Sequence, residues 1–183
     1  ETGVESAPNF TSKVINCGVF SIWNQFLLPV LLKLYRIDVY HSTNYMIPLL
    51  AFPRSGRGRT KCVTTIHDVI PMIFPTHAPK SKKARMYPIY RWLMRQVGAR
   101  ANAIITDSRA SRADVIKHLD IPASSEEKVK AVYCGVADRF TPPSHRRWKR
   151  GHEPRTVLYV GRSDPYKNIA TMVCALSIAR KKT

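Results

Sequence analysis

The segment Cys62–Asp68, CVTTIHD, decides the fold class that the sequence predicts. Its first five residues are apolar or β-branched, as in a buried strand, and the run then stops at a histidine and an aspartate. Four other short runs have this form and also end in polar residues or glycine: 37–40, 103–106, 129–133 and 156–160. Because helix-like segments separate these runs, we expect an α/β fold with a Rossmann-like parallel sheet.

Three helices can be placed from their spacing. The first carries apolar residues at helical intervals, namely Met86, Ile89, Tyr90, Leu93, Met94 and Val97. The second is expected to begin at a capping box formed by Ser111 and Asp114, and to stop before Pro122. A last amphipathic helix is expected from Ile169 to Ala179.

The composition favours anionic partners. The 183 residues contain 30 Lys and Arg against 12 Asp and Glu, a net charge of +18, which suits nucleic acid, phosphate-bearing ligands or an anionic membrane. Four cysteines without CxxC spacing indicate neither a zinc site nor a redox pair, and we expect buried free thiols. With no apolar run as long as a membrane span, we expect a cytoplasmic protein, with peripheral attachment to the inner membrane face as an option.

The composition changes near Thr141, where prolines and the basic run Arg146–Arg150 interrupt the apolar pattern. We interpret 1–142 as one domain, 143–155 as a basic linker and 156–183 as the start of a second domain. The alternative is a long surface loop within one domain.

The carboxyl ends of parallel strands meet at one edge, and ligands of open α/β sheets bind there. This rule predicts a cleft lined by His41, His67, Asp68, Asp107 and Ser108. We take His67 and Asp68 as the candidate catalytic pair, because imidazole titrates near neutral pH and can donate to, accept from or orient a hydroxyl, and the carboxylate next in sequence can hold neighbouring groups in place. The alternative is a histidine that only satisfies backbone groups at a strand end.

A second candidate site lies in LYVGRSDPYKN, residues 158–168. Gly161 permits a tight turn, Arg162 offers a forked donor, and Lys167 adds a point charge near a helix start. Together these features predict a cradle for a diphosphate. The spacing matches neither a Walker loop nor a GxGxxG turn, and an ordinary solvated surface is the alternative.

A basic tract follows the His-Asp pair, because 69–106 contains no Asp or Glu. Aromatic residues alternate with its cations, and the tract predicts docking on anionic lipid headgroups. An ordinary solvated face and nucleic-acid binding are the alternatives. Its cations are Lys80, Lys82, Lys83, Arg85, Arg91, Arg95 and Arg100, and the aromatic residues are Tyr87, Tyr90 and Trp92.

Four motifs occur in a familiar order: TTIHDVIP, TDSRASRADV, VKAVYCGVADRFTPP and VLYVGRSDPYKNI. In this order they resemble the retaining glycosyltransferases of family 4, which have the GT-B fold of two Rossmann-like domains facing a cleft. The resemblance implies that residues up to 142 form much of the acceptor-side domain. It implies that residues from 156 form the first βα unit of the nucleotide-sugar domain.

The resemblance also implies an activity: transfer of a sugar, with retention, from a UDP- or GDP-sugar to a saccharide or lipid-linked acceptor. Arg162 and Lys167 match the basic pair that grips the donor diphosphate, and His67 matches the cleft histidine beside the transferred sugar. Ser108 and Gly135 match positions that line the cleft and the turn before the linker. Members of the family need no metal ion, so no cofactor and no metal site are expected.

Two departures from the family pattern accompany these matches. The chain ends before the paired-glutamate motif of the donor domain, and the glycine-rich turn near the amino terminus is not visible. We therefore expect a truncated member whose exposed strand edge makes it a dimer or a sticky monomer. The rival function is a non-catalytic basic α/β module that binds anionic membrane or nucleic acid.

Overall fold

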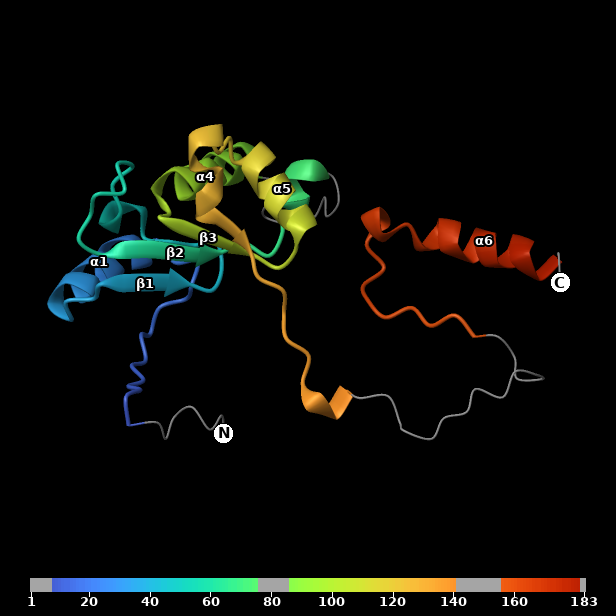
Figure 1. Cartoon of the computed structure of the whole chain (residues 1–183), viewed down its shortest axis with the longest axis horizontal. Coiled ribbons are helices and arrows are strands. Elements are labelled where there is room, and N and C mark those ends of the chain that lie inside the picture. The colour runs from blue at the N-terminus through green and yellow to red at the C-terminus, as the bar shows by residue number, and fades with distance from the viewer. Residues whose placement is uncertain (1–7, 76–85, 141–155, 182–183) are drawn as a thin grey trace.

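The computed structural model describes residues 8–75, 86–140 and 156–181. Its centre is a parallel four-stranded sheet in the order β1-β2-β3-β4 (Figure 1). The strands are β1 (Val39–Ser42), β2 (Lys61–Thr65), β3 (Ala103–Thr106) and β4 (Val129–Ala131). With its flanking helices this sheet confirms the predicted Rossmann-like α/β fold.

The first strand lies two residues further along the chain than expected. Backbone and side-chain hydrogen bonds at its start explain the shift, since Lys61 donates its amide to the Asp38 carbonyl at 2.7 Å and Thr60 donates its hydroxyl to the Ile37 carbonyl at 2.7 Å. The register then pairs His41 with Val63, so His41 lies within β1 and not after it.

The helices are α1 (Asn24–Leu34), α2 (Ile70–Ile73), α4 (Tyr87–Arg100), α5 (Arg109–His118) and α6 (Ile169–Lys181). Four short 3₁₀ turns accompany them in the described residues: η1 (Leu49–Ala51), η2 (Ala123–Lys128), η3 (Asp138–Phe140) and η4 (Pro165–Lys167). The helix expected from Met86 is confirmed as α4, although Met86 and Ile89 of its expected apolar stripe are exposed. Helix α1 is an element that the spacing analysis missed.

Helix α5 begins three residues earlier than the capping-box pattern predicted. Its N-cap is Ser108, whose hydroxyl oxygen accepts the Ser111 amide at 3.0 Å, so Ser111 lies at the third helical position. The expected box at Ser111 and Asp114 is therefore wrong. The reason is that Thr106 ends the strand only two residues before Ser108, and an extended serine at that point can satisfy the first free amides of the helix. The helix does stop before Pro122, as expected.

The core lies where the sheet meets α4 and α5. Cys62, Ile104 and Val129 of the strands are fully buried, together with Val97 of α4 and Val115 of α5. Burial alternates along β3, so Ile104 and Thr106 face the core while Ala103 and Ile105 are only partly covered. Each fully buried aliphatic side chain of this kind contributes roughly 1.5–3 kcal/mol.

The cysteine prediction holds only in part. All four thiols are free, but Cys62 alone is buried, while Cys17 is half-buried and Cys134 and Cys174 are exposed. Burial raises the pKa of the Cys62 thiol to about 12. Among the described residues, no helix is both long enough and apolar enough to cross a bilayer.

The segment 156–181 forms only half of the expected βα unit. Helix α6 is present, but 156–160 is exposed and has no neighbouring strand among the described residues, and a parallel strand requires a hydrogen-bonded neighbour. Met172, Val173 and Leu176 of the apolar stripe of α6 are exposed as well. A ring contact joins this segment to the sheet domain, since Tyr166 stacks on Phe74 with 6.1 Å between ring centroids.

Several predicted features lie outside the described residues. These are the whole of the basic linker 143–155, including Arg146–Arg150, and the amino-terminal part of the basic tract with Lys80, Lys82, Lys83 and Arg85. The boundary placed at 142 stays a prediction.

Truncation of Ile104 to Ala is expected to lower the free energy of unfolding by about 2–5 kcal/mol, because it leaves a cavity beneath α4 and α5. Urea denaturation measures the loss. Ile89→Ala is the matched control, since Ile89 is 58% exposed on α4 and should cost less than about 1 kcal/mol. Equal losses in the two variants would contradict the placement of the core.

Candidate functional site

The carboxyl edge of the sheet brings together residues that are far apart in sequence. Strand β1 leads to Thr43, β2 to His67 and Asp68, and β3 to Asp107. The ladder continues past β2, because the Ile66 amide donates to the Ile105 carbonyl at 2.8 Å. This extra bond places the residues that follow β2 beside those that follow β3.

His67 is held by two acceptors. Its Nδ1 lies 2.8 Å from Oδ2 of Asp107, and its Nε2 lies 3.2 Å from the carbonyl oxygen of Thr43. A carboxylate and a carbonyl both accept hydrogen bonds, so the arrangement is fully satisfied only when both ring nitrogens carry protons. The side chains remain accessible, with 58% of His67 and 34% of Asp107 exposed.

These contacts raise the pKa of His67 above its ordinary value. The hydrogen bond to Asp107 is the main cause, and the negative charges of Asp107 and Asp68 and the bond to Thr43 act in the same direction. Partial burial opposes the shift. The site therefore favours an imidazolium, which donates hydrogen bonds and places positive charge at the carboxyl edge of the sheet.

Asp68 lies next to His67 but points its carboxylate at the backbone. Its Oδ1 accepts the Ile70 amide at 3.0 Å, which anchors the turn that opens α2. The partner that orients the imidazole is Asp107 and not Asp68. A catalytic role for Asp68 stays a prediction.

The remaining cleft residues differ in their surroundings. Nε2 of His41 lies 3.0 Å from the hydroxyl oxygen of Thr65 on the neighbouring strand. Ser108 uses its hydroxyl to cap α5. Gly135 is exposed, and a Cβ built on it would meet nothing within 4 Å. The structure brings His67 and Asp107 together, whereas Gly135 contacts neither of them among the described residues.

The loop after β1 positions the Thr43 carbonyl. The side chain of Gln25 in α1 anchors this loop through two hydrogen bonds. Its Nε2 donates to the Ile47 carbonyl at 3.1 Å, and its Oε1 accepts the Leu49 amide at 2.8 Å. The hydroxyl of Thr64 donates to the Asn44 carbonyl at 2.7 Å. Sequence reasoning missed Thr43 and Gln25; the polar run HSTN, residues 41–44, was the available signal.

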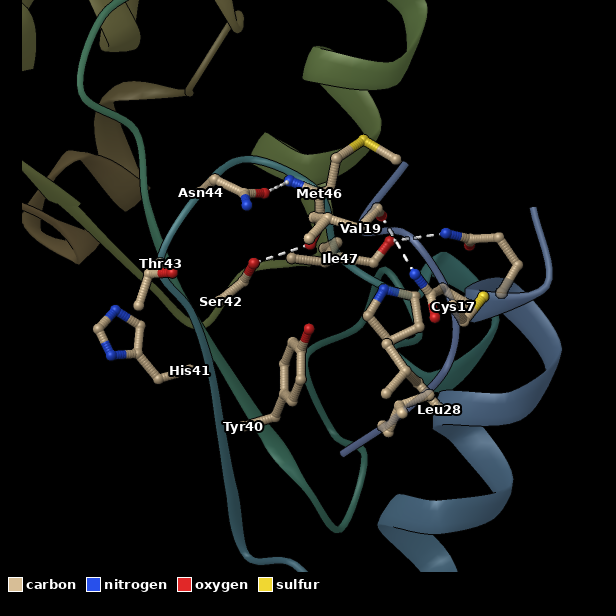
Figure 2. A pocket seen from close by; sticks show the side chains of 14 residues that line it. Cys17, Val19, Leu28, Tyr40, His41, Ser42, Thr43, Asn44, Met46 and Ile47 are labelled. Carbon is tan, nitrogen blue, oxygen red and sulfur yellow. Dashed lines mark hydrogen bonds between the residues drawn. The ribbon is translucent and has the colours of Figure 1, made fainter. Parts of the chain in front are cut away.

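A pocket of about 250 Å³ lies between this loop and α1 (Figure 2). Tyr40 and Ser42 point toward it, while His41 projects on the other side of the strand, as the alternation of β1 requires (Figure 2). Two of the pocket's polar side chains already bond to the loop backbone: Ser42 donates to the Met46 carbonyl at 2.7 Å, and Asn44 accepts the Met46 amide at 2.7 Å. The pocket is thus built mainly to fix the loop.

The predicted diphosphate cradle has one feature that demands glycine. Gly161 has φ of +155°, and a Cβ there would lie 2.8 Å from the hydroxyl oxygen of Tyr159. Arg162 is 86% exposed, with its Nη2 3.4 Å from Oδ1 of Asp164, and the Lys167 ammonium lies 5.0 Å from the Tyr166 ring centroid. In the described chain no hydrogen bond or ion pair joins Arg162 or Lys167 to His67, so their convergence on one site stays a prediction.

The fold and the polar residues at the carboxyl edge of the sheet define a class: Rossmann-like domains, which bind ligands at this edge of a parallel sheet. The family model described as Glycosyltransferase Family 4 matches residues 4–140, which is most of the chain and includes all four strands. The chain therefore belongs to this family, whose general activity is glycosyl transfer. No curated protein and no solved structure matches the chain.

Replacing Asp107 with Asn should lower the pKa of His67, because it removes the main group that stabilises the imidazolium. NMR titration of the His67 ring measures this pKa, and Asp138→Asn, an exposed change in η3, serves as the control. An unchanged His67 pKa in Asp107→Asn would contradict the geometry.

The same pair should make stability depend on pH. The pKa of His67 is raised in the folded state. The contribution of the His67–Asp107 pair to the free energy of unfolding is therefore fully present below the unfolded pKa of about 6.5, and it is lost as pH rises through the folded pKa. The advantage of the parent chain over Asp107→Asn should therefore shrink with rising pH. At this exposure it should not exceed about 1 kcal/mol in urea denaturation.

Proposed function

We propose that this chain contributes to transfer of a sugar, with retention, from a nucleoside-diphosphate donor to a saccharide or lipid-linked acceptor. The observation that carries the proposal is His67, held by Asp107 and the Thr43 carbonyl at the carboxyl edge of a family 4 domain. A cationic, hydrogen-bonding side chain at this edge suits a polyhydroxylated and negatively charged substrate.

His67 is best suited to act as a donor and not as a general base. Both ring nitrogens face acceptors, so a free lone pair is not available while the two bonds persist. The bond to Thr43 is the longer of the two, and a sugar hydroxyl can replace that carbonyl without disturbing Asp107. In this proposal Asp107 keeps the ring charged and oriented, while Nε2–H binds the substrate.

The departing nucleoside diphosphate needs positive charge where negative charge develops. Arg162 and Lys167 supply it in the proposal, and Gly161 lets the backbone approach the phosphates. The present partner of Arg162 does not prevent this role, because an exposed pair with Asp164 at 3.4 Å stabilises by at most about 1 kcal/mol. A diphosphate offers more charge and more acceptor oxygens than Asp164. The proposed reaction requires no metal ion.

The ring contact between Tyr166 and Phe74 supports a common site. Tyr166 precedes Lys167, and Phe74 follows α2, the short helix that begins just after His67 and Asp68. The contact therefore joins the neighbourhood of Lys167 to the segment that leaves the cleft.

The second candidate function is a basic surface that binds anionic membranes or nucleic acid. It is favoured by Trp92, which is 55% exposed on α4 next to the exposed Arg91. Sedimentation with anionic vesicles and with oligonucleotides at two salt concentrations tests it, since charge-driven binding weakens with salt. Peripheral membrane attachment and a homodimer also stay proposals.

Isothermal titration calorimetry with UDP and GDP tests the donor site. The double variant Arg162→Ala, Lys167→Ala should weaken binding of the preferred nucleotide at least about tenfold, because charge-assisted bonds to phosphate are lost. Arg180→Ala, Lys181→Ala removes equal charge from the end of α6 and should bind as the parent does. Absence of binding heat at millimolar nucleotide, or equal nucleotide affinity in the two double variants, would contradict the proposed donor site.

A further inference from the structure

A second cavity, of about 440 Å³, lies at the opposite end of the sheet from His67. It is lined by residues just before the strands, including Gly56 before β2, Asn102 before β3 and Lys128 before β4. The amino ends of the strands are far from the carboxyl edge that forms the candidate cleft. This cavity is therefore separate from the transfer site.

Two arginines share one uncharged acceptor beside this cavity. Arg54, which lines the cavity, places Nε and Nη2 at 3.3 and 2.7 Å from Oε1 of Gln96, and Nη1 of Arg100 lies 2.5 Å from the same oxygen. An amide oxygen has two lone pairs, so three donors exceed what it can accept. Gln96 is only 6% exposed, so water cannot readily reach this oxygen to accept the surplus guanidinium hydrogen bonds.

The arginine pair also lacks a negative partner. Within the described part of the chain, neither Arg54 nor Arg100 has a carboxylate within 4.0 Å, and the buried Nε of Arg100 has no hydrogen-bond partner. Burial and the nearby charge of Arg54 both lower the pKa of Arg100. Two guanidinium groups held on one oxygen repel each other, and a buried donor without an acceptor costs free energy.

A third cation, Lys128, lines the same cavity. The Lys128 ammonium reaches into the same cavity wall and donates to the Gly98 carbonyl at 2.6 Å. One carboxylate, that of Asp120, lines the cavity, but its Oδ2 already pairs with Nη2 of Arg95 at 2.7 Å. The hydroxyl-bearing residues Ser55 and Ser125 also line the cavity. The cluster therefore offers several donors and an excess of positive charge.

We propose that Arg54 and Lys128, which line the cavity, and Arg100, which shares the Gln96 oxygen with Arg54, form a binding site for a tetrahedral oxyanion, most simply the phosphate of a phosphomonoester. A phosphate group has several acceptor oxygens and up to two negative charges, which match two guanidinium groups and an ammonium group. The cavity is larger than one inorganic phosphate, so the phosphate would carry an attached organic group. Its binding would relieve the repulsion between Arg54 and Arg100.

Thermal unfolding of the full chain with inorganic phosphate tests the site, with sodium chloride at matched ionic strength as the reference. At phosphate tenfold above its dissociation constant, the melting temperature should rise by about 3 °C or more. In Arg54→Gln, Arg100→Gln the rise should disappear, while Arg91→Gln, Lys117→Gln removes equal charge from exposed helix positions and should keep it. A rise of equal size with chloride, or in all variants, overturns the proposal.

A third variant keeps the test decisive if the double arginine variant does not fold. Gln96→Glu has nearly the same shape and places a carboxylate between the two guanidinium groups. It should raise the melting temperature without phosphate, and it should abolish most of the phosphate response. A full phosphate response in Gln96→Glu overturns the site.

The source of the phosphate is decided by vesicle flotation. Vesicles that contain phosphatidic acid present the phosphomonoester at a membrane, and vesicles of neutral lipid are the control. Flotation that requires Arg54 and Arg100 supports a lipid headgroup as the ligand, whereas a phosphate response without flotation supports a free phosphorylated metabolite. Flotation that persists in Arg54→Gln, Arg100→Gln, combined with no phosphate response, overturns the proposal and favours a nonspecific basic surface.

Discussion

The pairing of β2 with β3 is the constraint on which the candidate site depends. Thr65 is opposite Ile105, and the Ile66 amide extends the ladder by one more bond to the Ile105 carbonyl at 2.8 Å. That bond fixes where the chain leaves each strand, so His67 emerges beside Asp107. A slip of one of these strands by one residue would turn its side chain to the other face and separate His67 from Asp107.

Local patterns predicted the strands and the cleft edge well, because strand runs and their polar ends are properties of short segments. His67 and Asp107 were both expected at this edge on that ground. The partner of His67 was harder to predict, since Asp68 is adjacent in sequence but its carboxylate satisfies the Ile70 amide. Thr43 contributes a backbone carbonyl, and no side-chain pattern encodes that role. The cap of α5 was misplaced because Ser108 and Ser111 are both good capping residues, and the strand end decides between them.

The scarcity of carboxylates explains much of the electrostatic arrangement. The chain has 12 acidic residues against 30 basic ones. Three of the acidic residues form ion pairs in the described part of the chain: Asp107 with His67, Asp120 with Arg95 and Asp164 with Arg162. At Arg54 and Arg100 the acceptor is the amide oxygen of Gln96. An amide can accept a hydrogen bond but cannot neutralise charge, so the positive potential there remains available to a mobile anion.

The two ends of the sheet therefore hold positive charge in different ways. At the carboxyl edge the charge on His67 is balanced by Asp107, and it can be lost as pH rises, so this end suits a substrate that must bind and leave. At the amino end the cations are two guanidinium groups, which stay charged at physiological pH, and the ammonium group of Lys128. Because a ligand there would bind independently of the protonation state of His67, it could change the stability of the sheet without entering the transfer reaction.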